Sequence, residues 1–298
     1  MNNVRIKLGI LFTSILTLIS PKLNTKFMYW RRFGRRLDLN NPQTSNEKVL
    51  WLKFNTYYKN PLIIKCADKY AVREYVKDCG CSEILNDLYG VYNNVDDINF
   101  SDLPNKFVAK LNYGCGMNLI CKDKAKLDEM QTRRMFKKWM KSKQHLRFSE
   151  MHYSYIEKKI VCEKYLDTNN NSAPDDYKIY CCNGIPYYVM VCIGRDKGRP
   201  KFYYFDCEGN LQRKMTNDGL NAPENFVYNK PEGWNEMIEY AKLLSKPFPF
   251  VRTDFYLVDG KVIFGELTFT PAAGLDSKKL EYTDKLLGQL IDLSNSNC

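Results

Sequence analysis

The chain has 298 residues, of which 44% are hydrophobic and 27% are charged, and its formal net charge is +11. This composition is that of a folded globular protein with room for two or three small domains, and it excludes a disordered or fibrous chain. The positive charge and an aromatic content of 14% would suit nucleic-acid binding. However, many cations lie before residue 37, and no helix-turn-helix, zinc-finger or RNA-binding motif follows. We therefore expect no nucleic acid among the partners.

The eleven cysteines do not indicate a disulfide scaffold, because the chain is large and the number of cysteines is odd. Most of them sit in apolar runs such as 119–121 and 160–162, which favours reduced, buried thiols. Their spacing is also wrong for a zinc site, since Cys79 and Cys81 are too close and Cys181 and Cys182 are adjacent. We expect no metal-thiolate centre.

An uncharged apolar run at residues 8–20 follows Arg5 and Lys7. No signal-peptide cleavage site comes after it, and a helix of this length spans only about 20 Å, less than the roughly 30 Å of a bilayer core. Two interpretations remain open. The run can lie in the interface of an anionic membrane, or it can pack on the body of the protein. We expect a cytoplasmic protein, with peripheral contact at the inner face of the cell membrane in the first case.

The remaining elements follow in chain order. A helix is expected to begin at Ser45 and run through Phe54, and a second helix is expected over 63–77. Two later helices are expected at 126–141 and 234–245. Short β-like runs dominate after residue 106, at 107–111, 118–121, 160–166, 177–182, 186–193, 202–206, 250–258 and 262–268. Asn183-Gly184 and Asp259-Gly260 are typical of tight hairpins. The pattern predicts an α+β fold with mainly antiparallel sheets.

Lys110 lies on an expected strand, and Gly114 and Gly116 follow it in a loop that leads to the next strand. A P-loop would run from a strand into a helix and would place its lysine after the glycines. A hairpin flap is the alternative phosphate-binding arrangement, in which backbone amides cover a triphosphate and the strand lysine neutralises it. Considered alone, the segment also suits an ordinary hairpin with a surface lysine.

The strand at 160–166 is apolar at first and becomes polar at Glu163. Such a strand end can bind the edge of a purine through backbone groups, with Tyr165 or Leu166 packed against the ring. An exposed strand end is the alternative.

Two expected strands joined by the Asp259-Gly260 turn carry Arg252, Asp254, Glu266 and Thr268 at alternating positions. Side chains two residues apart share one face of a strand, so Arg252 shares a face with Asp254, and Glu266 shares a face with Thr268. Buried carboxylates on these apolar strands need a cation. That cation is either Mg²⁺, which prefers oxygen ligands and phosphates, or Arg252 in a structural ion pair.

The order of these segments resembles the ATP-grasp superfamily. From about Asn46 the chain resembles its TupA-like branch, which is associated with teichuronopeptide and other surface polysaccharides. The narrower resemblance is carried by four segments at residues 46–53, 67–73, 248–252 and 265–271. It implies two α+β subdomains that grip ATP after a helical N-terminal region. The expected divisions are a basic segment at 1–45, a helical region at 46–105, and the two subdomains at 106–166 and 167–298.

The resemblance also implies nucleotide-binding roles. It assigns the α and β phosphates to Lys110, the flap to Gly114 and Gly116, and the ribose or phosphates to Asp176. It assigns adenine to the strand end that carries Glu163, Lys164, Tyr165 and Leu166.

The resemblance further implies a catalytic group around Mg²⁺. Asp254 and Glu266 would bind the metal, Lys178 would lie near the γ-phosphate, and Arg252 would hold the transferred phosphoryl group or the acyl phosphate. Thr268 stands where many ATP-grasp enzymes have asparagine. Because a hydroxyl is a weaker metal ligand than an amide oxygen, the expectation of a second Mg²⁺ site is less secure than that of the first.

The implied function is ATP-dependent amide-bond formation between a carboxylate, such as a uronic acid of a glycan, and an amine or amino acid. Two alternatives come from other classes. A glycosyltransferase would need a doubly wound α/β sheet, and the sequence lacks that alternation of strands and helices. A non-catalytic membrane-associated scaffold would not need Lys110, Asp254 and Glu266 together.

Overall fold

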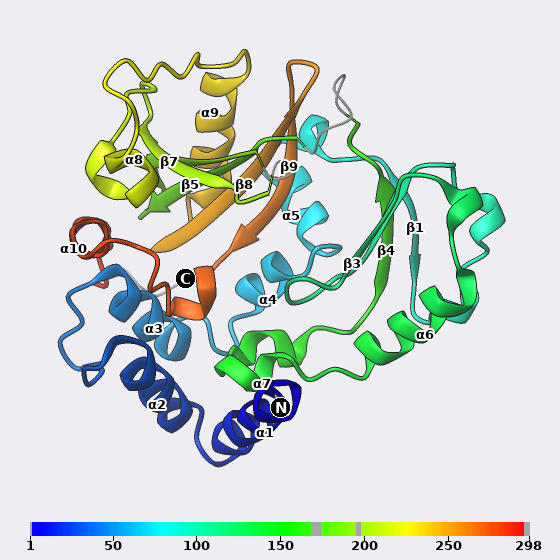
Figure 1. Ribbon diagram of the computed structural model, residues 1–298, viewed down its shortest axis with the longest axis horizontal. Helices are drawn as coiled ribbons and strands as arrows, with labels where there is room; N and C mark the ends of the chain where they lie inside the picture. The colour runs from blue at the N-terminus through cyan, green and yellow to red at the C-terminus, as the bar shows by residue number, and fades with distance from the viewer. Residues whose placement is uncertain (1, 168–173, 195–197, 295–298) are drawn as a thin grey trace.

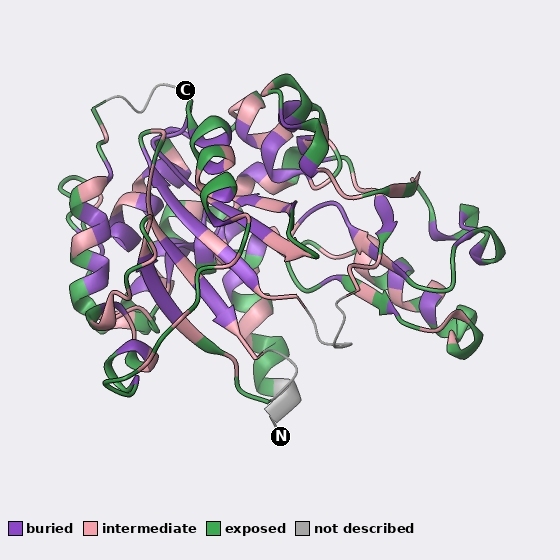
Figure 2. Ribbon diagram, turned by 90° about the horizontal axis from the view of Figure 1, so that it is seen from above, coloured by how far each residue is buried: buried purple, intermediate pink, exposed green. Residues whose placement is uncertain are grey.

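A computed structural model describes residues 2–167, 174–194 and 198–294. It contains two antiparallel sheets with helices around them, which confirms the expected α+β class (Figure 1). Buried side chains are concentrated along the strands, whereas the N-terminal helix is largely exposed (Figure 2). The fold therefore presents two sheet surfaces between which a site can form.

The first sheet has the strand order β1-β4-β2-β3. Its strands are β1 (Leu88–Tyr92), β2 (Phe107–Leu111), β3 (Asn118–Cys121) and β4 (Ile160–Lys164). We did not expect β1, which pairs antiparallel with β4 along the edge of the sheet. It lies inside the region predicted to be helical, and the division of the chain into subdomains stays a prediction.

The second sheet has the strand order β7-β6-β5-β8-β9, and every pair is antiparallel. Its strands are β5 (Asp176–Cys182), β6 (Ile185–Ile193), β7 (Lys201–Asp206), β8 (Phe250–Val258) and β9 (Lys261–Thr268). Asn183 and Asp259 adopt positive φ angles of 51° and 50° in the two hairpins, as the Asn-Gly and Asp-Gly turns predict.

Three helices open the chain, namely α1 (Asn2–Ile19), α2 (Pro21–Phe33) and α3 (Ser45–Asn55). Helix α3 begins at Ser45 as expected, and a capping box fixes its start, because Thr44 accepts from the backbone of Glu47 and Glu47 accepts from that of Thr44. Tyr29 of α2 donates to Glu47 at 2.7 Å, so the first helices are tied to the rest of the fold.

The single helix expected over 63–77 is wrong, because the chain breaks there into α4 (Pro61–Ala67) and α5 (Val72–Asp78). Asp68 causes the break. Its Oδ1 accepts from the backbone N–H groups of Tyr70 and Ala71, and its Oδ2 accepts from Asn112 at 2.8 Å. A side chain that bonds the backbone ahead of it competes with continued helix. The break places Lys69 between the two sheets.

The other α-helices are α6 (Glu129–Met140), α7 (His145–Phe148), α8 (Asn217–Leu220), α9 (Trp234–Ser245) and α10 (Glu281–Leu290). The 3₁₀ turns are η1 (Ser82–Ile84), η2 (Val95–Asp97), η3 (Phe100–Asp102), η4 (Lys124–Lys126), η5 (Met151–Tyr155), η6 (Arg213–Met215) and η7 (Pro271–Gly274). Helix α9 packs on β5, β6 and β8. A large core of aromatic and aliphatic side chains joins both sheets.

Helix α1 packs on α2 and α7 through a face that includes two buried threonines. Thr17 donates to the carbonyl of Leu146 at 2.6 Å, and Asn24 of α2 donates to Thr17 at 2.8 Å. The apolar side chains lie on the other face, where Leu8, Leu11, Phe12, Ile15, Leu18 and Ile19 are exposed. Within the described ranges, no helix is both long and apolar enough to cross a membrane. One face of this run thus packs on the protein, and the opposite face is exposed, while contact with a membrane stays a prediction.

Candidate functional site

Lys110 of β2 and Glu163 of β4 form the charged surface of the first sheet. The Nζ of Lys110 lies 2.6 Å from Glu163 Oε2, and Arg73 of α5 lies 3.7 Å from Glu163 Oε1. Glu163 is 7% exposed, so this carboxylate is buried beside two cations. The sequence predicted sites at both residues, and the structure brings them into direct contact.

The expected hinge for a purine lies at the end of β4. The Lys164 side chain pairs with the Asp87 carboxylate at 2.9 Å. The backbone N–H of Lys164 donates to the Asp87 carbonyl, and the Lys164 carbonyl accepts from the Asn86 side chain. Asn86 Nδ2 reaches that carbonyl at 2.9 Å. A ligand that uses the Lys164 carbonyl would therefore share it with this amide or displace it. Tyr165 and Leu166 line the same cavity as Lys110.

The glycine loop between β2 and β3 is held closed by backbone and side-chain bonds. Gly114 and Gly116 have φ angles of 69° and 73°, which favour glycine. A Cβ on Gly114 would lie 2.6 Å from Gln144 Oε1, so the Gln144 side chain would have to shift to admit one. Lys69 Nζ donates to the Gly114 carbonyl at 2.6 Å. The loop is anchored from outside its own sheet.

Three adjacent strands of the second sheet carry the other charged cluster. In the register, Lys178 of β5 faces Asp254 of β8, which faces Glu266 of β9. Lys178 Nζ lies 2.7 Å from Asp254 Oδ2 and 2.5 Å from Asp176 Oδ2. Asp254 is 3% exposed, whereas the side chain of Glu266 is 39% exposed. Only the first of the two expected metal carboxylates is thus fully buried.

Arg252 neutralises Asp254 directly. Its Nε and Nη2 donate to the two carboxylate oxygens, each at 2.7 Å, in the bidentate geometry typical of strong pairs. Burial alone would lower the pKa of Arg252, but Asp254 raises it well above its usual value. Burial alone would raise the pKa of Asp254, but Arg252 and Lys178 lower it. The ion pair between Arg252 and Asp254 that we considered from the sequence is therefore present.

Thr268 joins this pair to Glu266. It accepts from Arg252 Nη2 and donates to Glu266 Oε1, both at 3.2 Å. As expected from strand alternation, Arg252 lies with Asp254 and Glu266 lies with Thr268. The described part of the chain holds no group of three His, Cys, Asp or Glu side chains suited to a metal. Two carboxylates and a hydroxyl fit a Mg²⁺ that takes its other ligands from phosphates and water.

Lys69 links the second charged cluster to the glycine loop of the first sheet, and no role for it was expected from the sequence. Its Nζ lies 3.5 Å from Glu266 Oε2 while it bonds the glycine loop. Its backbone N–H also donates to the Asn112 carbonyl at 2.7 Å. The sequence did contain a signal for a helix end at this position, because Asp68 precedes Lys69 and aspartate favours helix caps and turns over helix interiors.

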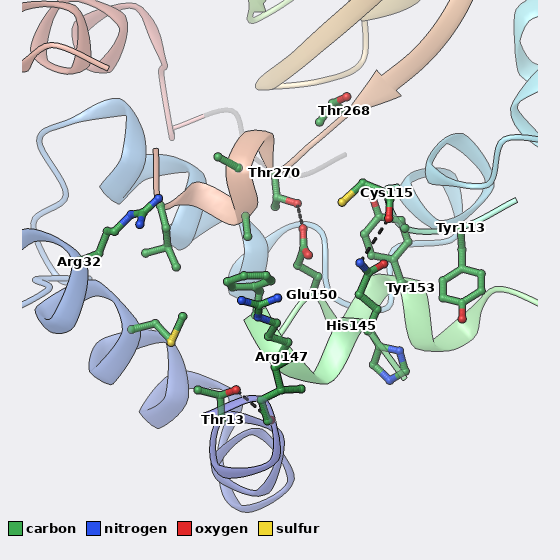
Figure 3. Close-up of a pocket in the computed structure, with 18 of the residues that line it drawn as sticks. Thr13, Arg32, Tyr113, Cys115, His145, Arg147, Glu150, Tyr153, Thr268 and Thr270 are labelled. Carbon is green, nitrogen blue, oxygen red and sulfur yellow. Dashed lines mark hydrogen bonds between the residues drawn. The ribbon is translucent and has the colours of Figure 1, made fainter. Parts of the chain in front are cut away.

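Two cavities meet at these residues. The inter-sheet cavity, of about 540 Å³, is lined by both charged clusters and includes Lys110, Glu163, Lys178, Asp254 and Glu266. The helix-lined cavity, of about 770 Å³, is bounded by α1, α2 and α7 as well as by η7, and Figure 3 shows part of its lining. Tyr113, Gly114, Cys115 and Glu266 line both. Arg252 lines only the helix-lined cavity, and its partner Asp254 lines only the inter-sheet cavity.

The sequence profile described as TupA-like ATPgrasp matches residues 47–292. The chain belongs to the TupA-like ATP-grasp family. A comparison with curated proteins finds no match. The family match confirms the resemblance that was stated from the motifs.

Among solved structures, the L-amino acid ligase from Bacillus licheniformis is similar, with a TM-score of 0.51 and 13% identity. The match covers 83% of this chain and 54% of that ligase. D-alanine–D-alanine ligase from Bacillus anthracis matches with a TM-score of 0.44 and 16% identity, over 76% of this chain and 66% of that one. At 13% identity the likeness to the L-amino acid ligase shows a shared fold and not a shared substrate.

Proposed function

We propose that this ATP-grasp protein is an ATP-dependent ligase that joins a carboxylate to an amine. One observation carries the proposal, namely that lysines and carboxylates from two sheets surround one cavity, and that a second cavity meets it at Glu266 and the glycine loop. ATP would occupy the inter-sheet cavity. The acceptor would enter the helix-lined cavity, so that its carboxylate meets the γ-phosphate at the junction.

The residues proposed to bind the nucleotide all line the inter-sheet cavity. Lys110 would contact the α and β phosphates, and the loop with Gly114 and Gly116 would cover them with backbone N–H groups. Asp176 would face the ribose or the phosphates. Adenine would lie at the end of β4, against the group formed by Glu163, Lys164, Tyr165 and Leu166.

Asp254 and Glu266 would hold Mg²⁺, with Thr268 as a weaker ligand, and the metal would neutralise charge on the phosphates. In the structure both oxygens of Asp254 already accept hydrogen bonds. A Mg²⁺ held there would share the Asp254 carboxylate with Lys178 and Arg252. These two cations would also supply positive charge to the phosphoryl group.

In the reaction, a carboxylate oxygen attacks the γ-phosphorus and ADP leaves, which gives an acyl phosphate. Lys178 and Arg252 would stabilise the charge on the transferred group. A neutral amine then attacks the acyl carbon, the C–O bond to phosphate breaks, and the nitrogen loses a proton. The products are an amide, ADP and phosphate. No protein nucleophile takes part in this scheme.

The carboxylate would belong to a bacterial surface polysaccharide or its precursor, and the amine to an amino acid. This finer assignment rests on the family's association and on the size of the helix-lined cavity. Mass spectrometry of candidate uronic acids and amino acids incubated with Mg·ATP tests it, with a mass equal to the two substrates less water as the expected product. Consumption of ATP without such a product for any pair would refute the ligase proposal.

A further inference from the structure

The helix-lined cavity is strongly basic. Five arginines line it, against the two carboxylates Glu150 and Glu266. One of the five, Arg252, is already paired with Asp254. The other four come from helices that lie mostly outside the matched family region, and they are Arg5 of α1, Arg31 and Arg32 of α2, and Arg147 of α7.

These four arginines have no acidic partner within the described residues, where no carboxylate oxygen lies within 4.0 Å of their guanidinium groups. Nearby Arg35 behaves differently, since it lies 3.4 Å from Glu47. Arg147 packs against the ring of Phe148, with its guanidinium 4.8 Å from the ring centre. Stacking of this kind fixes the guanidinium plane while leaving its N–H groups free to donate.

The cavity has two chemically different ends. Glu266 lies at the junction with the inter-sheet cavity, and Thr268, which bonds it, and Arg252 line the helix-lined cavity beside it. Figure 3 shows Arg32 and Arg147 reaching in from α2 and α7, with Glu150 and Thr270 between Arg147 and Thr268. Glu150 accepts from Thr270 at 2.6 Å, and burial raises its pKa. The Glu150 carboxylate is thus bonded to Thr270, and it lies more than 4.0 Å from the guanidinium nitrogens of the four arginines.

We propose that the helix-lined cavity binds an acceptor that carries a second anionic group, distinct from the reacting carboxylate, and that Arg32 and Arg147 hold this group with help from Arg31. The proposal rests on the proposed function, because it takes this cavity to be the acceptor site. Guanidinium groups bind carboxylates and phosphates alike, so the second group is one of these two. At about 770 Å³ the cavity has room for a sugar-sized acceptor.

The test measures binding of four sugars by calorimetry with Mg·AMP-PNP at saturation. D-glucuronate 1-phosphate carries both anions, glucuronate carries only the carboxylate, glucose 1-phosphate carries only the phosphate, and glucose carries neither. We expect D-glucuronate 1-phosphate to bind most tightly and glucose not to bind. The single-anion sugars show which anion the arginines recognise, since the one that they hold binds measurably better than glucose.

Arg32→Gln and Arg147→Gln should each weaken binding of the anionic sugars about tenfold, which is the loss expected for one charged hydrogen bond. Arg36→Gln is the matched control, because Arg36 is an exposed arginine just after the same helix and lines neither cavity. The proposal is overturned if no anionic sugar binds, if glucose binds equally well, or if all three variants behave alike. Failure of Mg·AMP-PNP itself to bind would refute the proposed function instead, so the two failures are distinguishable.

Discussion

Lys69 Nζ lies 3.5 Å from Glu266 and 2.6 Å from the Gly114 carbonyl, so one side chain links the second sheet to the glycine loop of the first. The break between α4 and α5 puts it there. This lysine therefore bridges the two surfaces that would enclose the nucleotide.

We expect Lys69→Met to raise the KM for ATP about tenfold, because the glycine loop loses a charged hydrogen bond that holds it over the cavity. Steady-state ADP release measures this. Lys77→Met removes an exposed lysine from the neighbouring helix α5 and should leave the KM unchanged. Equal KM values for both variants would show that Lys69 does not position the loop.

Asp254→Asn and Glu266→Gln should lower the stability of the protein by different amounts, but both should abolish its activity. Asp254 is buried with two cations, so its replacement should lower the free energy of unfolding by about 3–5 kcal/mol. Glu266 is 39% exposed in its side chain and makes longer contacts, so its replacement should cost about 1 kcal/mol or less.

Both variants should release ADP at the background rate, because each removes an anionic ligand of Mg²⁺. Urea unfolding and ADP release, measured on the same preparations, give the comparison. Turnover within a few-fold of the parent in either variant would remove that residue from the metal site.

The pH dependence of stability should also reflect Asp254. Its folded pKa lies below the unfolded value, so its carboxylate stabilises the fold above about pH 4, and this contribution is lost as the pH falls through the folded pKa. We expect the difference in unfolding free energy between the parent and Asp254→Asn to be largest near pH 7 and to shrink below pH 4. A difference that does not change with pH would mean that the charge of Asp254 is not what stabilises the fold.

The exposed apolar face of α1 should bind anionic bilayers. Leu11, Phe12 and Leu18 are 57%, 49% and 72% exposed. Exposed cations on the following helix and loop, such as Lys22, Lys26 and Arg36, would meet anionic headgroups. The protein should float with phosphatidylserine vesicles and not with phosphatidylcholine vesicles. Replacement of the three apolar residues by serine should abolish flotation.

Leu220→Ser is the control for that experiment, since Leu220 of α8 is 55% exposed at a site remote in sequence. If the triple variant floats as well as the control, the apolar face of α1 does not contact lipid.

The sequence predicted the strands that carry the charged clusters, because period-two alternation and Asn-Gly or Asp-Gly turns are local signals. It also placed Arg252 with Asp254 on one face of β8, as the structure confirms. The roles assigned to these residues stay predictions.

The sequence did not predict the elements whose structure depends on distant partners. Strand β1 forms because β4 pairs with it, and the break at Asp68 is stabilised by Asn112 from the glycine loop. The helix-lined cavity was missed for the same reason. Arg32 and Arg147 are more than 100 residues apart along the chain, and only tertiary packing of α1 and α2 on α7 brings both to one cavity.

An isotope experiment tests the central claim, that ATP activates a carboxylate for amide formation. The protein is incubated with Mg·ATP, amino acids and uronic acids, and all carboxylates are labelled with ¹⁸O. Formation of an acyl phosphate followed by attack of the amine leaves one carboxylate oxygen in the released phosphate. The account predicts phosphate that carries one ¹⁸O for every amide formed, and loss of that product in Glu266→Gln. Release of ADP with unlabelled phosphate, or no release of ADP with any pair of substrates, would contradict it.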